Sequence, residues 1–398
     1  MAPNLYIWTP IPPLKTGTAD YADLFIRDLQ ACVPNYNVQI VCDFGNNVTR
    51  PPTEYRGLKV HNPGCVLPKH SDLHFVFTAN NNFHAFAFRF LRNRPRGKIV
   101  TFVHDLSVFM LVDRMCWDGY DGLSIDDFKD FIAHESCAPQ NAVLKTLKEQ
   151  CLPELMKYTL MCQSLTLKRS AALVTHSHYA ALRLLLEHDF PSPPVLVMEH
   201  PRPENVDLPY VPKEHVFRVG VFGWIAESKR PVTVVRAFRQ FVESLPPSDR
   251  DSVRLVFVGE LAKKDLDPRK LAAAYGISDL VETTGYASEA RFNAELQRCA
   301  AIVNLRFPSA GETSGTMHRA RAHGIPVVLS AYQAFREEPA YKHVTLGDSE
   351  ESQVASALRT LYREFRTGNI SANRPNPNLA LPRKLSVGEM FQAVCNIV

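Results

Sequence analysis

The chain has 398 residues, of which 45% are hydrophobic and 22% charged, and this composition excludes a disordered or fibrous protein. The length is sufficient for two domains, each with its own hydrophobic core. The 45 basic and 41 acidic residues give a formal net charge of +4, which is too balanced to indicate a nucleic-acid partner.

The nine cysteines include no Cys-x-x-Cys pair, and their number is odd, a pattern typical of a reducing compartment. The residues before Pro10 have no basic flank, so they are not expected to be a secretory signal. No apolar run reaches the ~18 residues that a spanning helix needs. We therefore expect a cytoplasmic protein, in which any membrane association is peripheral and at the inner face.

The first half of the chain alternates short apolar runs with amphipathic stretches, which predicts a parallel sheet covered by helices. From about residue 110 to 139 this alternation breaks, and we predict an irregular excursion there. The expected strands are 5–8, 38–42, 75–77, 99–103, 172–175 and 195–198, and the expected helices are 21–33, 83–91, 140–167 and 179–188.

Residues 200–215 contain four prolines, which do not fit inside helices or central strands, so this segment is predicted to be an interdomain linker with a hinge near residue 210. The predicted domains are residues 1–205 and 206–380, followed by a terminal helix within 381–398 that packs back towards the first domain. A second alternating series predicts strands 218–222, 254–258, 280–283, 301–305 and 326–329, and helices 232–244, 268–275, 289–299, 314–323 and 386–398. Two such doubly wound sheets predict a ligand cleft at the carboxyl ends of their strands.

The segment from 304 to 330 is the most informative, because it reads as strand, loop, helix, turn and strand. Gly311 and Gly315 would let the backbone approach a ligand, and the amides of Ser314, Gly315 and Thr316 open a helix whose positive end favours phosphate. Glu312 would accept hydrogen bonds from sugar hydroxyls beside that phosphate. The alternative is that Glu312 only caps the helix.

A second candidate site follows the strand at 218–222. Lys229 and Arg230 stand at a helix entry that Pro231 starts well, and two adjacent cations there can clamp a diphosphate. Cations at that end oppose the helix dipole, which makes a purely structural role less attractive. The alternative is a solvated basic pair on a loop.

Two segments of the first half end strands at the same edge. Residues 12–21 lead from the first strand into the first helix, and Gly17 could admit a phosphate or an acceptor, although the loop has no Gly-x-Gly-x-x-Gly or phosphate-loop pattern. His104 and Asp105 close the strand at 99–103, where a histidine can donate to a sugar oxygen or to developing charge. The alternative for His104 is a bond to a backbone carbonyl that only holds a loop.

The segment 83–96 mixes aromatic residues with arginines, which is compatible with a membrane-surface helix. A helix that packs its aromatic residues on the sheet and directs its arginines outward fits the βα series better. The remaining histidines lack metal-ligand spacing, and Asp265 and Asp267 read as solvated surface, so neither a metal nor a cofactor is expected.

Together these segments resemble the retaining GT-B glycosyltransferases of family four, also called glycosyltransferases group 1, over nearly the whole chain. Residues 16–21 are similar to the glycine loop of that family, 80–84 to a segment of one of its subgroups and 103–105 to its cleft histidine. Residues 223–230 resemble its phosphate-binding lysine region, and 311–316 resemble its donor loop.

The resemblance implies an α/β fold of the GT-B type, with two doubly wound Rossmann-like domains facing each other across a cleft. It also implies a retaining, metal-independent hexosyltransferase that moves a sugar from a nucleotide-diphosphate sugar to a hydroxyl of a glycan, lipid-linked or small-molecule acceptor, as in polysaccharide or glycoconjugate biosynthesis. The first domain would lie on the acceptor side, and the second would bind the donor.

The same resemblance implies roles for individual residues. Glu312 and His104 would be the catalytic residues that hold the donor sugar. The donor diphosphate would be bound by Lys229, Arg230, Gly17, Ser314, Gly315 and Thr316. Contacts to the nucleotide or the acceptor are expected from Gly223, Gly285, Tyr286, Asp105 and Asp20.

Two positions depart from the pattern of this family. Ala320 stands where many members have a second glutamate for the ribose, and Trp224 stands where many have an arginine. One alternative is a GT-B epimerase or hydrolase, for which Glu135 is the candidate water-activating carboxylate. Another is a catalytically inactive protein that binds a nucleotide sugar.

Overall fold

The computed structural model describes residues 3–133, 135, 139–188, 191–203 and 215–398, and the chain forms two compact units. The first unit comprises Met1–Pro201, Ala310–Thr313 and Pro382–Val398, and the second comprises Arg202–Ser309 and Ser314–Leu381. The predicted domain boundary at 205 and 206 and the hinge near 210 lie outside the described residues.

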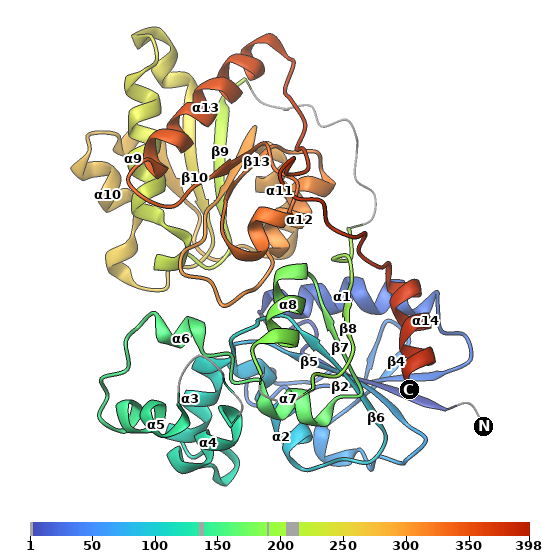
Figure 1. Ribbon diagram of the computed structural model, residues 1–398. Helices are drawn as coiled ribbons and strands as arrows, with labels where there is room; N and C mark the ends of the chain where they lie inside the picture. The colour runs from blue at the N-terminus through green and yellow to red at the C-terminus, as the bar shows by residue number, and fades with distance from the viewer. Residues whose placement is uncertain (1–2, 134, 136–138, 189–190, 204–214) are drawn as a thin grey trace. The chain divides into compact units, whose positions relative to one another are not determined.

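A parallel sheet forms the centre of the first unit, with one antiparallel pair, β3 and β4, at its edge (Figure 1). Its strand order in the described chain is β3-β4-β2-β1-β5-β6-β7-β8, so the order reverses between β1 and β5. The strands are β1 Asn4–Trp8, β2 Asn37–Val41, β3 Glu54–Tyr55, β4 Leu58–His61, β5 Leu73–Thr78, β6 Lys98–Val103, β7 Ala172–Thr175 and β8 Val195–Val197.

A second sheet forms the centre of the second unit and is parallel throughout its described pairings. Its order is β11-β10-β9-β12-β13-β14, with the reversal between β9 and β12. The strands are β9 Phe217–Phe222, β10 Val253–Val258, β11 Val281–Thr283, β12 Ala301–Asn304, β13 Val327–Ser330 and β14 Lys342–Val344. The predicted α/β fold with two parallel sheets is confirmed.

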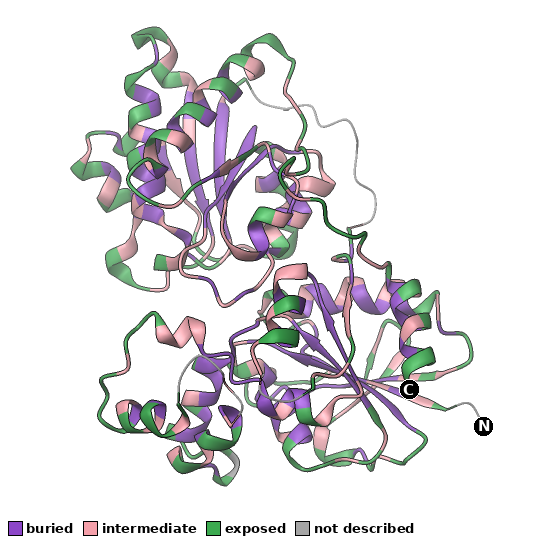
Figure 2. Ribbon diagram, viewed as in Figure 1, coloured by how far each residue is buried: buried purple, intermediate pink, exposed green. Residues whose placement is uncertain are grey.

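Helices cover both sheets, and Figure 2 shows strands that are almost wholly buried beside helices that are buried on one side only. This is the burial pattern expected of strands covered on both faces and of amphipathic surface helices. In the first unit the covering helices are α1 Gly17–Gln30, α2 Ala85–Arg92, α7 Ser164–Arg169, α8 His178–Leu186 and α14 Val387–Ile397. In the second unit they are α9 Pro231–Glu243, α10 Pro268–Ala274, α11 Glu289–Arg298, α12 Gly315–Ala322 and α13 Glu350–Thr367.

Helix α14 packs against α1 and enters the core of the first unit. Its start is fixed by a capping box, in which Ser386 and Glu389 bond to each other's backbone amides. The side chains that it adds to this core are Val387, Met390, Phe391 and Val394.

We expect Met390→Ala to lower the free energy of unfolding by about 2–5 kcal/mol, because the side chain is fully buried and its removal leaves a cavity. Urea unfolding measures this difference. The exposed Gln392 on the same helix provides the control, and Gln392→Ala should change stability by no more than about 0.5 kcal/mol. Equal stability of the two variants would show that α14 is not part of this core.

The excursion predicted as irregular over 110–139 contains α-helices and 3-10 turns in its described part, so the prediction is wrong for those residues, and turns and loops connect them. The helices are α3 Phe109–Trp117, α4 Phe128–Phe131, α5 Gln140–Lys148 and α6 Met156–Thr159, and in Figure 1 they form a group beside the first sheet. They share one hydrophobic cluster. The longest of them have nine residues, and such short helices depend for their stability on this common packing.

The single helix predicted over 140–167 is also wrong, because the chain forms α5, α6 and α7 there. Gln150 adopts a left-handed conformation with φ of 54°, and Pro153 follows three residues later. A left-handed residue ends a helix, and a proline prevents its continuation, so the break is encoded locally.

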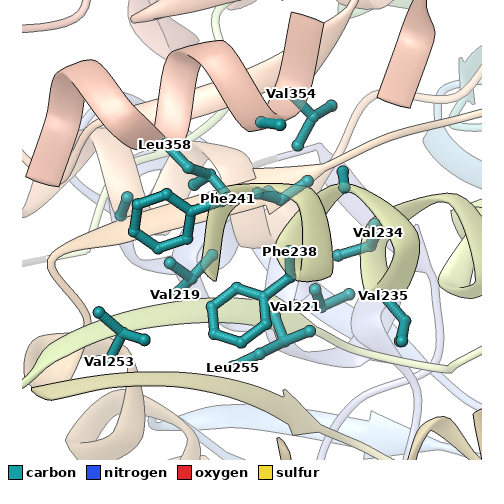
Figure 3. Packing of buried hydrophobic residues seen from close by; sticks show 14 of the residues in the cluster. Val219, Val221, Val234, Val235, Phe238, Phe241, Val253, Leu255, Val354 and Leu358 are labelled. Carbon is teal, nitrogen blue, oxygen red and sulfur yellow. The ribbon is translucent and has the colours of Figure 1, made fainter. Parts of the chain in front are cut away.

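Helix α13 and strand β14 complete the second unit and were not among the predicted elements. Figure 3 shows Phe238 and Phe241 of α9 packed among residues of β9, β10 and α13, including Val219, Leu255 and Leu358.

Among the described residues, no helix is both long enough and apolar enough to cross a lipid bilayer.

Candidate functional site

In the second unit, the two segments singled out in the sequence follow the two strands at the sheet reversal. Residues 223–230 follow β9, and residues 305–309 follow β12 before the chain passes through 310–313, which belong to the first unit. The two loops are joined, because the Phe307 N–H donates to the carbonyl oxygen of Ser228 at 2.9 Å. In open α/β sheets, a reversal point at the carboxyl ends of strands is where ligands bind. The fold thus brings both predicted segments to one place.

Lys229 lies in this place with its side chain buried. Its ammonium donates to the carbonyl oxygen of Phe222, the last residue of β9, at 2.5 Å. A Cβ added to Gly223, which has φ of +86°, would lie 3.2 Å from Nζ of Lys229 and 3.8 Å from Oγ1 of Thr316. Gly223, Lys229 and Thr316 therefore surround the same small volume, and only glycine fits at 223 without displacing the ammonium.

Arg230 forms an ion pair within the second unit. Its guanidinium donates to the carboxylate of Glu350, which is 1% exposed, with 3.0 Å between Nε and Oε2. Arg230 itself has φ of 57°, and its guanidinium carbon lies 5.9 Å from the ring centre of Phe307. The alternative of a freely solvated basic pair is therefore wrong, and the charge of Arg230 is balanced within the unit.

Helix α12 begins beside these loops. Ser314 is its N-cap residue, and its Oγ accepts a hydrogen bond from the Met317 N–H at 3.3 Å. The alternative that Glu312 caps this helix is therefore wrong. Gly315 and Thr316 are the first two residues of the helix, where amide groups have no intrahelical acceptor.

Of the other residues predicted for the second unit, Gly285 lies next to this cluster, because its bridge partner Gly259 packs against Gly223. A Cβ added to Gly259 would lie 2.1 Å from the Gly223 carbonyl oxygen. Gly285 has φ of +67° and forms an isolated bridge with Gly259, and Tyr286 is half exposed. Trp224 is also largely exposed, whereas Ala320 belongs to a hydrophobic cluster. Ala320 therefore packs in the core and offers no hydrogen-bonding side chain to a ligand.

In the first unit, the loop before α1 is held by a histidine from another segment. Gly17 is the first residue of α1, and a Cβ there would meet nothing within 4 Å. The hydroxyl of Thr18 lies 2.9 Å from Nε2 of the buried His84, whose Nδ1 lies 2.8 Å from the carbonyl oxygen of Phe77. Since Nδ1 donates to this carbonyl, Nε2 accepts from the hydroxyl. The sequence indicates nothing about His84 beyond the resemblance of residues 80–84 to a segment of one subgroup.

His104 lies at the carboxyl end of β6, in contact with an aromatic residue of α1. Its ring centre is 4.4 Å from that of Tyr21 in an edge-on arrangement. Its Nε2 is buried and has no hydrogen-bond partner among the described residues. Burial, and then the neighbouring histidines, hold the pKa of His104 well below its usual range, so the ring is neutral at pH 7. The alternative that this ring nitrogen only holds a loop is not supported.

Tyr21 is the centre of a larger group of rings. The rings of His176 and His200 lie 5.1 and 5.0 Å from its ring centre, and the Tyr21 hydroxyl has no hydrogen-bond partner among the described atoms. His176 bonds to the carbonyl oxygen of Met198 through Nδ1. Nothing in the sequence signals that these two histidines converge on Tyr21.

The surroundings of Asp105 and Asp20 give each carboxylate a structural role. The carboxylate of Asp105 accepts from the Asn80 N–H at 2.6 Å, and Oδ1 of Asn80 accepts from the Leu111 N–H at 3.0 Å. Asp105 therefore holds the backbone after β5, and the side chain of Asn80 links that segment to α3. Asp20 lies in the first turn of α1, where a carboxylate favours the helix dipole.

The loop that carries Glu312 belongs to the first unit. The Ser107 N–H donates to the carbonyl oxygen of Ala310 at 2.8 Å. A Cβ added to Gly311, which has φ of +82°, would lie 2.4 Å from Cβ of Leu106. Close packing that only glycine permits therefore holds the Glu312 loop against the residues that follow His104.

Glu135, the candidate base of an epimerase or hydrolase, holds a backbone segment. Its two carboxylate oxygens accept from the N–H groups of Met161 and Cys162 at 3.1 and 2.6 Å. Burial raises the pKa of Glu135 to about 7 in spite of these bonds. These two hydrogen bonds explain the position of Glu135 without a catalytic role. Among the described residues, no group of three or more His, Cys, Asp or Glu is arranged to hold a metal ion.

Comparison with known proteins finds one family model that matches most of the second unit. Residues 216–364 match the family model described as glycosyl transferases group 1. No match was found among curated protein sequences.

Solved structures resemble the chain over nearly its whole length. One is Anabaena Alr3699/HepE in complex with UDP, with 12% identity, TM-score 0.56 and coverage of 99% of this chain and 94% of the other. Another is sucrose-phosphate synthase from Thermosynechococcus elongatus, with 13% identity, TM-score 0.58 and coverage of 92% of each chain. A third is an E. coli trehalose-6-phosphate structure bound with UDP-2-fluoro glucose, with 10% identity, TM-score 0.56 and coverage of 92% and 93%. The chain thus has the fold of these proteins, and its residues 216–364 match the glycosyl transferases group 1.

Proposed function

We propose that this protein is a retaining glycosyltransferase that moves a sugar from a nucleotide-diphosphate sugar to an acceptor hydroxyl. The observation that carries this proposal is the position of Lys229. Its buried ammonium lies beside Gly223 and Thr316, where two loops meet at the reversal point of the second sheet. A cation beside a glycine and a helix start suits a diphosphate. Two of the solved structures named above hold UDP or a UDP-sugar.

In the proposed reaction, the acceptor oxygen forms a bond to the anomeric carbon while the bond from that carbon to the diphosphate breaks. The acceptor proton passes to the departing phosphate oxygen, so no protein base is required. Lys229 neutralises the charge that develops on the diphosphate, and the free amides at the start of α12 add hydrogen bonds. His104 and Glu312 hold the hydroxyls of the donor sugar.

Binding of nucleotide sugars tests the donor site. We expect one of the UDP, GDP, ADP or dTDP sugars to bind, and Lys229→Met to weaken this binding about 10-fold to 100-fold, because a charge-assisted hydrogen bond contributes roughly 1.5–3 kcal/mol. Methionine fills the buried space without the charge. Calorimetric titration of wild type and variant measures the difference.

The matched control is Lys342→Ala. Lys342 is exposed at the amino end of β14, on the opposite edge of the sheet from Lys229. This variant should bind as the wild type does. If Lys229→Met also bound as tightly as the wild type, or if no nucleotide sugar bound at all, the proposed donor site would be wrong.

The stereochemistry and the metal requirement are tested once the donor is known. NMR of the first product should show the anomeric configuration of the donor, and EDTA should leave the rate unchanged. An inverted product or a rate abolished by EDTA would contradict the corresponding part of the proposal.

A further inference from the structure

A second pocket lies in the first unit, between α2, α4 and α7. Its volume is about 380 Å³, which is large compared with the ~30 Å³ that one water molecule occupies in the liquid. Basic side chains predominate in its lining, and two carboxylates and an apolar base complete it. The lining residues are Arg92, Arg94, Asp127, Asp130, Phe131, Ala133, Leu165, Lys168 and Arg169.

The pocket is far from the donor-sugar residues of the same unit. Arg94 and Arg169 precede β6 and β7, so they lie at the amino edge of the sheet, whereas His104 follows the carboxyl end of β6. The six residues of β6 separate the two edges by about 20 Å. The pocket is therefore separate from the proposed transferase chemistry.

Three of its cations have no carboxylate partner in the described part of the chain. Arg92 pairs with Asp127 at 3.5 Å, but Arg94, Lys168 and Arg169 form no ion pair there. Nε of Arg169 is buried without a hydrogen-bond acceptor among the described atoms. Burial, and then the charge of Arg94, lower the pKa of Arg169. An anion in the pocket would balance the charge of these cations.

Helix dipoles explain only part of this arrangement. A cation at the carboxyl end of α2 or α7 is favourable, which accounts for Arg92, Lys168 and Arg169 taken one at a time. Arg94 lies beyond the end of α2, has φ of +50° and adds repulsion to Arg169. A non-glycine residue in this conformation costs free energy, and here it adds a further positive charge to the pocket.

The carboxylates restrict the kind of anion. Asp127 already accepts from Arg92 and from Ser124, whereas the exposed Asp130 has no ion pair among the described residues. A carboxylate repels a bare anion but accepts hydrogen bonds from hydroxyl groups. Basic donors and a free acceptor in the lining of one pocket suit a phosphate ester that also carries hydroxyls.

We propose that this pocket binds a hydroxylated phosphate ester, with Arg94, Lys168 and Arg169 on the phosphate and Asp130 on a hydroxyl. Phe131 and Leu165 form the apolar base. The ester is either a soluble sugar or polyol phosphate or the headgroup of a membrane lipid, since both present the same chemistry. The aromatic side chains Phe86, Phe88 and Phe90 of α2 are buried. The arginines at the end of that helix line the pocket instead of joining this packing.

Glycerol 3-phosphate and vesicles are the probes, in 150 mM NaCl so that loose surface attraction is screened. We expect saturable binding of glycerol 3-phosphate by calorimetry, weakened at least about tenfold in the double variant Arg94→Ala, Lys168→Ala, because two charge-assisted bonds are lost. Both side chains are exposed, so the variant should fold. The control Lys59→Ala, Lys69→Ala removes two exposed cations elsewhere in the same unit and should bind as the wild type does.

Co-sedimentation with phosphatidylcholine vesicles, with and without phosphatidylglycerol, separates the two sources. Binding to phosphatidylglycerol vesicles that the pocket variant alone loses identifies a lipid headgroup, and binding of glycerol 3-phosphate alone identifies a soluble ester. Absence of saturable binding to both probes, or equal binding by the pocket variant and the wild type, would overturn the proposal. Nucleotide-sugar binding measured on the same variant should be unchanged, so a failure here is distinct from a failure of the transferase proposal.

Discussion

Replacing His104 with alanine is expected to slow release of nucleoside diphosphate from the donor by about 10²–10³-fold, the usual cost of removing one preorganised donor from a polar site. The ring is neutral and buried, and its Nε2 has no partner among the described atoms, so it is ready to bond a sugar hydroxyl. Released diphosphate can be measured whether the sugar passes to an acceptor or to water. Glu312→Gln should lower the rate in the same way, because a neutral amide accepts hydroxyl protons more weakly.

The control is His74→Asn, a change of another buried histidine in the same unit. His74 accepts from the Trp8 indole N–H at 3.2 Å and contacts the Arg96 carbonyl, so its role is structural. This variant should lose stability but keep the rate. A His104→Ala protein that is folded by circular dichroism and turns over at the wild-type rate would remove His104 from the proposed mechanism.

Acidification from pH 7.5 to 5.5 should destabilise the protein by several kcal/mol. Burial lowers the pKa of His74 and His84 to about 4 and that of His176 to about 3. In the unfolded chain these groups take up protons near pH 6.5, so the unfolded state binds more protons below that pH, and stability is lost as the pH falls. Each contributes up to about 1.4 kcal/mol per pH unit.

Glu135 acts in the opposite direction. Its pKa is about 7 in the folded chain, so acidification neutralises this buried carboxylate and stabilises the fold. This gain in stability offsets the loss caused by about one of the three histidines. Urea unfolding at pH 7.5, 6.5 and 5.5 measures the net slope. His74→Asn should reduce that slope, whereas the exposed His70→Asn should leave it unchanged. Equal stability at pH 7.5 and 5.5 would contradict the assignment of neutral buried histidines.

The strands and most helices of the two sheets could be predicted because each displays its own period. The strand predicted at 172–175 is β7 with the same bounds, and the helix predicted at 232–244 is α9 shifted by one residue. Helix α13 carried an equally clear signal in the spacing of Val354, Leu358 and Leu361. The short helices between 109 and 159 give little signal in the sequence, because tertiary packing rather than periodicity stabilises them.

The candidate site was predictable in its segments but not in its partners. Residues after β9 and β12 converge because the topology places both at the sheet reversal, which strand order implies. The pair of Arg230 with Glu350 joins residues 120 apart, and the contact of His84 with Thr18 joins residues 66 apart. Sequence patterns within a window do not encode such long-range pairings, so these residues were found only in the folded chain.

The first unit is built from three separate stretches of the chain, and this has a consequence for its biosynthesis. Residues 382–398 leave the ribosome after the whole second unit has been made, yet α14 supplies part of the first unit's core. Nascent chains generally fold domain by domain as they emerge. The first unit therefore waits through translation with the apolar surface under α14 uncovered, where Tyr36 and Phe75 later meet Phe391.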